Sequence, residues 1–234
     1  MKQKIYKIKF FQVGEVYEIY AKNIYQSDFY AFLEIDGYIF DTKNNLVVDT
    51  SEEKLKAEKK ITDELAKHII DWSKQDEGVK KTNVNGWHSK TEMHTKPEYK
   101  HLVDELFRMQ FEIYNEEWLD REPKLGNMWA NINYNGGYNK PHIHPNALFS
   151  GVYYVKTQPN CGLLTCYDPR PGIQTNMPLR RKGQPPKHLW RETTIEPKEN
   201  RIIMFPAWLW HSVEPNKSND IRISVSFNFI QHGF

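Results

Sequence analysis

The sequence predicts an α+β fold: a jelly roll or barrel of short antiparallel strands, backed by helices and preceded by a small β-rich module. Apolar residues recur at helical spacing over residues 51–76 and 97–118, whereas they alternate with polar residues before and after that region. Many short strands separated by proline, glycine and asparagine follow the helices, which is typical of jelly rolls and barrels. We expect a module of residues 1–58 and a domain of residues 59–234 that begins with the support helices.

The N-terminal module is predicted to be a small antiparallel sheet. Strand-like runs cover residues 5–10, 16–20 and 38–40, with turn-forming residues between them. The segments Tyr17–Ile35 and Val47–Glu58 resemble a short bacterial family of unknown function. That resemblance implies no activity, so packing, substrate docking and formation of a homodimer stay open as roles of the module.

Two amphipathic helices are predicted to back the sheet. Ser51 is a good N-cap for the first helix, and the second runs from about Pro97 to Trp118. The apolar stripes are Ile61, Leu65, Ile69 and Trp72 in the first helix, and Leu102, Leu106, Met109 and Ile113 in the second. Residues 77–96 between them are predicted to be a loop whose Trp87 inserts into the domain. His88 and His94 of this loop are expected to be surface or structural residues.

The second half of the chain contains seven predicted strands. They cover residues 129–134, 149–155, 162–167, 193–195, 201–205, 210–213 and 221–230. Residues 168–192 form one long insertion with five prolines. Long loops of this kind in compact domains are typically lids or binding loops.

Composition and charge exclude several classes of protein. Thirty-two basic and thirty acidic residues leave a net charge of +2, so no overall field would recruit nucleic acid or a membrane. The two cysteines, Cys161 and Cys166, favour a reducing compartment over a disulfide framework. No run approaches the roughly 18 apolar residues of a membrane span, and the N-terminus lacks the apolar run of a signal peptide. We therefore expect a cytoplasmic protein with neither a membrane nor a nucleic-acid partner.

Three histidines form a candidate metal site. His142 and His144 are two residues apart, so on an extended segment both side chains point to the same face and can share one ion. His211 follows an apolar run far along the chain. Three protein ligands with open positions are how non-haem Fe(II) oxygenases leave room for oxygen and a co-substrate.

The last predicted strand carries an arginine that needs a partner. Its apolar face consists of Ile221, Ile223, Val225, Phe227 and Phe229, and its polar face of Arg222, Ser224, Ser226 and Asn228. Burying Arg222 without an anion would be costly. The anion is either a protein aspartate or glutamate, or a small-molecule carboxylate bound by the guanidinium with help from the Ser224 hydroxyl.

Seven short motifs of the second half follow one another in a recognisable order. They are Tyr134–His144, Ser150–Val155, Cys161–Thr165, Ile195–Pro197, Arg201–Pro206, His211–Val213 and Arg222–Ser224. As an ordered set they resemble the core of the Fe(II)- and 2-oxoglutarate-dependent oxygenases, above all the prolyl-hydroxylase-like branch and a set of oxygenases from marine bacteria and cyanophages. The resemblance covers about residues 80–234. It implies a double-stranded β-helix with Fe(II) and 2-oxoglutarate as cofactors.

The resemblance also implies roles for individual residues. His142 and His211 match the two histidine ligands of the family pattern. The positions that bind 2-oxoglutarate match Arg222, Ser224, Tyr134 and Tyr154, with Arg222 at the distal carboxylate. No catalytic residue beyond the metal ligands is implied.

One position departs from the family pattern, which has an aspartate or glutamate two residues after the first histidine. Here that residue is His144. Either three histidines bind the metal, or a carboxylate from elsewhere completes the set, with Asp168 as the best candidate. We prefer three histidines, because the spacing matches and Asp168–Pro169 is typical of a turn. Three neutral ligands also suit Zn(II).

The function implied by the resemblance is that of a 2-oxoglutarate-dependent dioxygenase, a hydroxylase that uses O₂. A prolyl residue of a peptide or protein is the first substrate to consider, and small molecules stay open because fold is a poor guide to substrate. Trp208, Trp210 and Tyr138 are expected either to flank the mouth of the site or to belong to the core. Arg170 is expected to contact an anionic substrate or to cap a turn.

Two other classes of function stay open. A cupin-like module that binds a metal or a sugar would keep the barrel without catalysis, but it has no need of a buried guanidinium beside the metal. A three-histidine zinc enzyme would need a general base near the metal, and the ligand segments offer none. Dependence of turnover on 2-oxoglutarate separates the three hypotheses.

Overall fold

The computed structural model describes residues 5–12, 15–22, 52–116, 118–170, 181–183 and 191–231. The predicted strand at 38–40, the predicted cap at Ser51 and most of the 168–192 insertion lie outside the described residues. The described helices are α1 (Glu52–Gln75), α2 (Lys100–Glu116) and the 3-10 turns η2 (Met93–Thr95) and η3 (Pro97–Tyr99). The described strands are β1 (Ile5–Gln12), β2 (Glu15–Lys22), β3 (Asn83–His88), β4 (Lys124–His142), β5 (Phe149–Lys156), β6 (Leu164–Tyr167), β7 (Glu192–Ile195), β8 (Arg201–Pro206), β9 (His211–Val213) and β10 (Arg222–Ile230).

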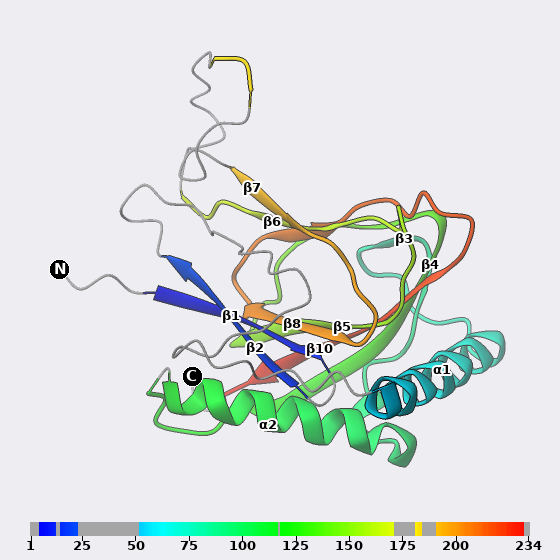
Figure 1. The fold of residues 1–234 in the computed structure, drawn as a ribbon, viewed down its shortest axis with the longest axis horizontal. Coiled ribbons are helices and arrows are strands. Elements are labelled where there is room, and N and C mark those ends of the chain that lie inside the picture. Colours follow the sequence, from blue (N-terminus) through cyan, green and yellow to red (C-terminus); the bar gives the residue numbers. More distant parts are fainter. Residues whose placement is uncertain are drawn as a thin grey trace.

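The described strands form one curled sheet in the order β2-β1-β8-β5-β10-β4-β9-β6-β7, with β3 paired to β4 (Figure 1). All these pairings are antiparallel. Strand β4 connects the two halves of the sheet, because residues 124–133 pair with β10 whereas Asn139 and His142 pair with β9. The seven strands predicted for the second half are all present, and the predicted double-stranded β-helix is confirmed.

The helices cover one face of β4, β5 and β10, as predicted (Figure 1). The apolar face of β10 packs toward them, and its fully buried residues are Ile223, Val225, Phe227 and Phe229. Phe107 of α2 meets Phe229 edge-on, with the ring centres 5.7 Å apart. Each such side chain contributes roughly 1.5–3 kcal/mol when it is fully buried. Of the stripe predicted for α1, Ile69 is fully buried, whereas Ile61 is 39% exposed.

Strand β3 corrects the prediction of a loop over residues 77–96. Residues 83–88 pair with the edge of β4 that faces away from β10, so they satisfy backbone groups that would otherwise lack partners. This strand is irregular: Asn85 has a positive φ, and the pairing with β4 is interrupted between Val84 and Gly86. The insertion of Trp87 is confirmed: its side chain is buried, and Nε1 donates to the carbonyl oxygen of Asp76 at 2.8 Å.

Two of the three predicted N-terminal strands are present as the β1–β2 hairpin. Residues 9–12 of β1 pair with residues 201–204 of β8, so this hairpin extends the main sheet. The division of the chain at residue 58 stays a prediction.

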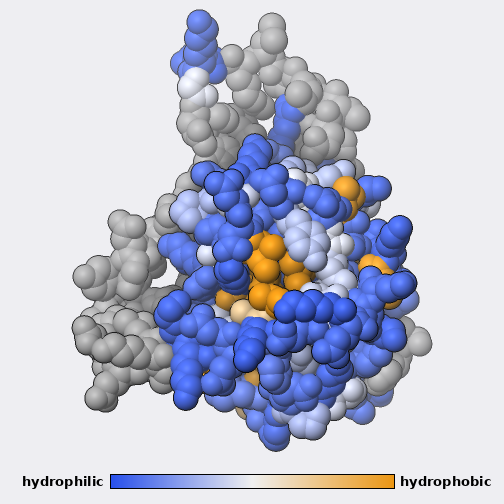
Figure 2. Space-filling model, turned by 90° about the vertical axis from the view of Figure 1, so that its right-hand side faces the viewer, coloured by the Kyte–Doolittle hydropathy of each residue, from blue (hydrophilic) through white to orange (hydrophobic). Residues whose placement is uncertain are grey.

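The described surface shown in Figure 2 is mostly hydrophilic, and hydrophobic residues gather in one area near its middle. No helix among the described residues is long and apolar enough to cross a membrane.

Candidate metal centre and anion pocket

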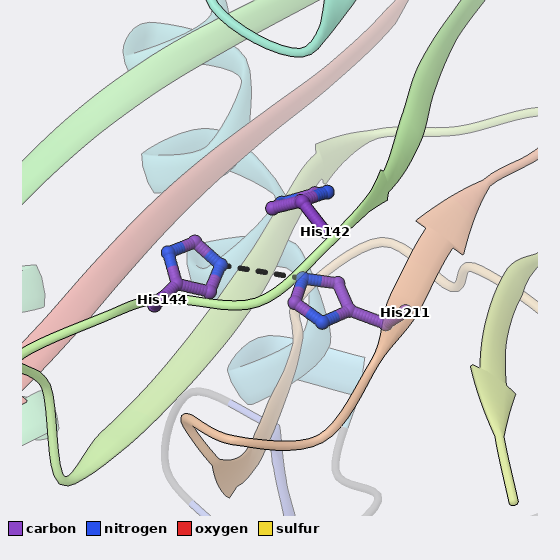
Figure 3. A group of neighbouring side chains, drawn as sticks. All are labelled: His142, His144 and His211. Atoms are coloured by element: carbon purple, nitrogen blue, oxygen red, sulfur yellow. Dashed lines mark hydrogen bonds between the residues drawn. The ribbon is translucent and has the colours of Figure 1, made fainter.

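The three predicted histidines lie together (Figure 3). His142 ends β4 and His211 begins β9, and their Cα atoms are partners in the pairing of these strands. His144 lies just beyond β4, where its backbone N–H donates to Ala207 at 3.0 Å. One nitrogen of each ring lies within 4.8 Å of those of the other two. The fold thus collects two neighbouring histidines and a distant third around one point.

Hydrogen bonds orient two of the rings. Nδ1 of His142 donates to the carbonyl oxygen of Lys140 at 2.7 Å, and Nδ1 of His211 donates to that of Leu209 at 2.8 Å. In these tautomers each Nε2 carries a lone pair, as a metal ligand requires. Nε2 of His144 lies 3.2 Å from Nε2 of His211. Two nitrogens bound to one ion at about 2.1 Å lie about 3 Å apart when they are neighbouring ligands, so this spacing suits a shared ion.

Partial burial of His142 and His144 and full burial of His211 keep the three imidazoles neutral. Burial lowers the pKa of all three, that of His144 to about 4 and that of His211 to about 3. The charge that His142 would carry lowers the pKa of the other two further. Since histidine binds metals in its neutral form, the site needs no proton release near pH 7.

A cavity of about 260 Å³ lies next to the histidines. On β4 it is lined by Asn127, Trp129, Asn131 and Asn133, and on β10 by Arg222, Ser224, Ser226 and Asn228. Each set consists of alternate residues, so the polar face predicted for the last strand is confirmed and β4 presents a matching one. The lining among the described residues contains no aspartate or glutamate.

Arg222 is 1% exposed and lines this cavity. Its Nη1 donates to the carbonyl oxygen of Cys161, with longer contacts to those of Gly162 at 3.2 Å and Glu214 at 3.4 Å. Its Nη2 is buried and has no hydrogen-bond partner. Among the described residues no ion pair includes Arg222. Of the two partners left open by the sequence, a protein carboxylate is therefore not supported.

Two further residues predicted to contact the co-substrate lie near Arg222. Ser224 and Tyr154 are partners in the pairing of β10 with β5, and both are buried and line the cavity. Burial raises the pKa of the Tyr154 phenol, so it stays protonated and can donate a hydrogen bond. The structure therefore brings Arg222, Ser224 and Tyr154 together in one part of the cavity.

Tyr134 and Tyr138 are not brought to this cavity. Tyr134 is 43% exposed, whereas the preceding Asn133 is 2% exposed and lines the cavity. Successive side chains of a strand point to opposite faces, and β4 turns Asn133 inward. Tyr138 is half-buried beside β3 and does not line the cavity. The predicted contacts of these tyrosines with co-substrate and substrate have no support in the structure.

The other predicted substrate residues lie outside the cavity as well. Trp208 is 46% exposed and Trp210 is 50% exposed, so neither belongs to the core. Arg170 forms an ion pair with the buried carboxylate of Asp168. Asp168 is not part of the histidine cluster, which favours three histidines over the alternative ligand set.

Several residues that line the cavity were not predicted from the sequence, among them His88, Asn127, Asn131 and Asn133. His88 is buried at the end of β3 and its ring stacks on Trp129 with the centres 5.4 Å apart. The asparagines do leave a signal in the sequence, because they alternate with apolar residues over 127–133.

Comparison with protein families confirms the resemblance found in the sequence. Residues 127–228 match the family described as "Putative 2OG-Fe(II) oxygenase". Residues 4–83 match a domain of unknown function, DUF1820. The first match supports the predicted cofactors, Fe(II) and 2-oxoglutarate, and the three histidines could bind the iron. No curated protein matches the sequence significantly.

Solved structures of low sequence identity share the fold. A prolyl-4-hydroxylase from Pseudomonas putida is 14% identical, with 75% of this chain and 88% of that chain covered and a TM-score of 0.54. HygX from Streptomyces hygroscopicus, with nickel and 2-oxoglutarate bound, is 10% identical, with 75% and 80% covered and a TM-score of 0.53. A Trichoplax adhaerens prolyl hydroxylase, in complex with a peptide fragment of the hypoxia inducible factor oxygen degradation domain, is 11% identical, with 73% and 78% covered and a TM-score of 0.52.

Proposed function

We propose that this protein is a 2-oxoglutarate-dependent oxygenase that binds Fe(II) through His142, His144 and His211 and hydroxylates an organic substrate. The family match over residues 127–228 and the shared fold support this proposal. They do not identify the reaction, so the proposed reaction rests on the residues that line the cavity.

The observation that carries the proposal is the unpartnered Nη2 of Arg222. A buried donor without an acceptor costs about 1–3 kcal/mol, and more when it belongs to a charged group. Nη2 is buried and belongs to a residue that lines the same cavity as the histidines. The distal carboxylate of 2-oxoglutarate would supply the missing acceptor and the missing negative charge. Ser224 and Tyr154 would add hydroxyl donors from the same side.

The histidines fit the metal part of the cofactor pair. Three neutral nitrogen ligands leave positions of an iron ion open for a co-substrate and for O₂. When bound together, Fe(II) and 2-oxoglutarate supply the oxidation of a C–H bond by O₂, with the keto acid converted to succinate and carbon dioxide.

The protein's own residues orient the reactants and exclude water. Phe205 packs against His211 with the ring centres 4.7 Å apart, and Val152 lines the cavity next to it. Such apolar walls keep water from competing for the site. The described lining offers no carboxylate as a general acid or base. An oxygenase does not require one, whereas a hydrolase does.

A prolyl residue of a peptide or protein is the first candidate substrate. Two prolyl hydroxylases are among the structures that share the fold, one of them with a peptide bound. HygX has also been solved with hygromycin B bound, so a small molecule is the alternative.

Formation of succinate tests the proposal. The full-length protein is incubated with Fe(II), 2-oxoglutarate and air, and succinate is measured with and without each component. We expect slow, iron-dependent succinate formation even without the substrate. It should be abolished in His211→Ala and preserved in His68→Ala, which removes an exposed histidine of α1. Equal rates in these two variants would contradict the proposal.

A zinc enzyme is the second candidate, because three histidines without a carboxylate ligand suit Zn(II). It would bind Zn(II) tightly and consume no 2-oxoglutarate. The absence of a carboxylate from the described cavity lining makes it the weaker candidate.

A further inference from the structure

The positions of the histidines divide the cavity into two ends. His144 contacts Trp129, with the ring centres 5.8 Å apart, and the Cα partner of Trp129 on β10 is Ser226. His211 contacts Phe205, whose partner on β5 is Ser150, and Ser150 in turn pairs with Asn228. The histidines therefore lie at the level of Ser226 and Asn228.

Arg222 lies at the opposite end of the strand's polar face. It is four residues before Ser226, which corresponds to about 13 Å along the strand. If 2-oxoglutarate lies between the histidines and Arg222, it occupies this arginine end. The part of the cavity beside the histidines, at the level of Asn228, is then left for the substrate. We call this part the asparagine end, because Asn127 and Asn228 line it, together with Thr91.

A chain of hydrogen bonds holds the two asparagines. The hydroxyl of Ser150 donates to Oδ1 of Asn228 at 2.7 Å, and Nδ2 of Asn228 donates to Oδ1 of Asn127 at 2.7 Å. This chain leaves the side-chain nitrogen of Asn127, with two N–H groups, without a bond to any described residue. The network thus presents fixed N–H donors to the cavity, and the Thr91 hydroxyl can both donate and accept.

Charge narrows the choice of substrate. The described cavity lining has no carboxylate that would pair with an ammonium group. Apart from histidine, the lining has two cationic residues, Arg222 and Lys81. Arg222 lies at the far end. Lys81 is exposed and lies two residues before Asn83, which pairs with Asn139 of β4. In the loaded site the two negative charges of 2-oxoglutarate offset those of the metal ion, so an anion at the asparagine end would meet little net positive charge there. A neutral group that accepts and donates hydrogen bonds fits this end best.

We propose that the asparagine end binds an amide of the substrate, either a carboxamide or a peptide bond beside the oxidised carbon. The amide oxygen accepts from Nδ2 of Asn127, and the amide N–H donates to Thr91 or to the remaining lone pair of Asn127. This inference rests on the proposed function for the assignment of the two ends, and it narrows the substrate to a peptide or another amide.

Binding of matched small probes tests the inference. Propanamide, propanoate and 1-propanol are titrated separately into the full-length protein loaded with Zn(II) and 2-oxoglutarate, and binding is followed by saturation-transfer NMR. We expect propanamide to bind about tenfold more tightly than the other two. Asn127→Leu should weaken propanamide binding about tenfold. Asn115→Leu, a matched change of an exposed asparagine on α2, should leave it unchanged.

Measurement of 2-oxoglutarate affinity in the same samples separates this inference from the proposed function. One outcome would overturn the amide site alone: 2-oxoglutarate binds, but propanamide binds no more tightly than 1-propanol or propanoate. Failure of wild type to bind 2-oxoglutarate would overturn the proposed function, and with it the division of the cavity on which the amide site rests. Asn127→Ala serves as a second variant, because it keeps the bond between Ser150 and Asn228 and avoids a larger side chain. If both variants fold and both still bind propanamide as tightly as wild type, the assignment to Asn127 is overturned.

Discussion

Two arginines of this chain differ in their partners: Arg222 lines the cavity, whereas Arg170 lies outside it. Arg170 follows β6, and its Nε donates to both oxygens of the Asp168 carboxylate, at 3.0 and 2.8 Å. Arg222 opens β10 and is more deeply buried, but it donates to backbone carbonyl oxygens and keeps one nitrogen unpartnered. The charge of Arg170 is balanced by a carboxylate two residues away, whereas Arg222 forms no ion pair with any described residue. The unpartnered nitrogen makes the surroundings of Arg222 the candidate anion site.

The largest expected effect is that of Arg222→Ala on the affinity for 2-oxoglutarate. Loss of two charge-assisted hydrogen bonds, each contributing about 1.5–3 kcal/mol, should weaken binding about a hundredfold or more. Metal binding should persist, because Arg222 does not belong to the cluster of three histidines. Isothermal titration of 2-oxoglutarate into the metal-loaded protein measures the change.

Arg170→Ala is the matched control for that experiment. It should leave the affinity for 2-oxoglutarate unchanged, because Arg170 does not line the cavity. An equal loss of affinity in both variants would break the distinction between the two arginines.

Gly162→Ala should reproduce part of the Arg222→Ala effect. Gly162 has a φ of +90°, and a Cβ there would lie 2.3 Å from the carbonyl oxygen of Glu214 and 2.8 Å from Nη1 of Arg222. Displacement of the guanidinium should weaken 2-oxoglutarate binding about tenfold. Gly183→Ala is the control, because Gly183 also has a positive φ but has no atom within 4 Å of its added Cβ. Unchanged affinity in Gly162→Ala would mean that this loop does not position Arg222.

The histidines, unlike the arginines, should make the stability of the metal-free protein depend on pH. The pKa of His144 is about 4 and that of His211 about 3 in the folded protein, against about 6.5 in an unfolded chain. Below pH 6.5 the unfolded state binds protons that the folded state does not, so stability falls as the pH decreases toward 4. Thermal unfolding across this range should show a weaker dependence in His144→Gln than in wild type or in His68→Gln. Identical curves for all three proteins would contradict the burial of His144.

Asp168→Asn should have the smallest effect and change stability alone. The Asp168 side chain is fully buried, but Arg170 is 30% exposed and can reach water, so we expect a loss of about 1–2 kcal/mol in urea unfolding. Metal and 2-oxoglutarate affinities should be those of wild type. Loss of metal binding would show that Asp168, rather than His144, is the third ligand.

Much of the fold could be predicted because one periodicity governs each region. The alternation in β10 correctly separated its apolar face from the face with Arg222. Strand β3 escaped prediction because its formation depends on the edge of β4, which lies more than forty residues further along the chain and is not visible in the polar local sequence.

The sequence motif predicted the candidate site correctly where the strand points the motif residue into the cavity, and wrongly where the strand points it outward. The three histidines come together, as the spacing of His142 and His144 and the family pattern for His211 predicted. Tyr134 matches a family motif, but the pairing of β4 turns Asn133 inward and Tyr134 outward. The partners of Arg222 could not be inferred from the sequence, because the carbonyl oxygens of Cys161 and Gly162 lie about sixty residues earlier in the chain.

Anaerobic titration of Fe(II) into the full-length protein, with and without 2-oxoglutarate, tests most directly whether the cavity holds this cofactor pair. We expect a weak visible charge-transfer band that requires both components, weakens in Arg222→Ala and persists in Arg170→Ala. Tight binding of Zn(II) without any such band in wild type would contradict the proposed function, and the likeness to the oxygenases would then describe the fold alone.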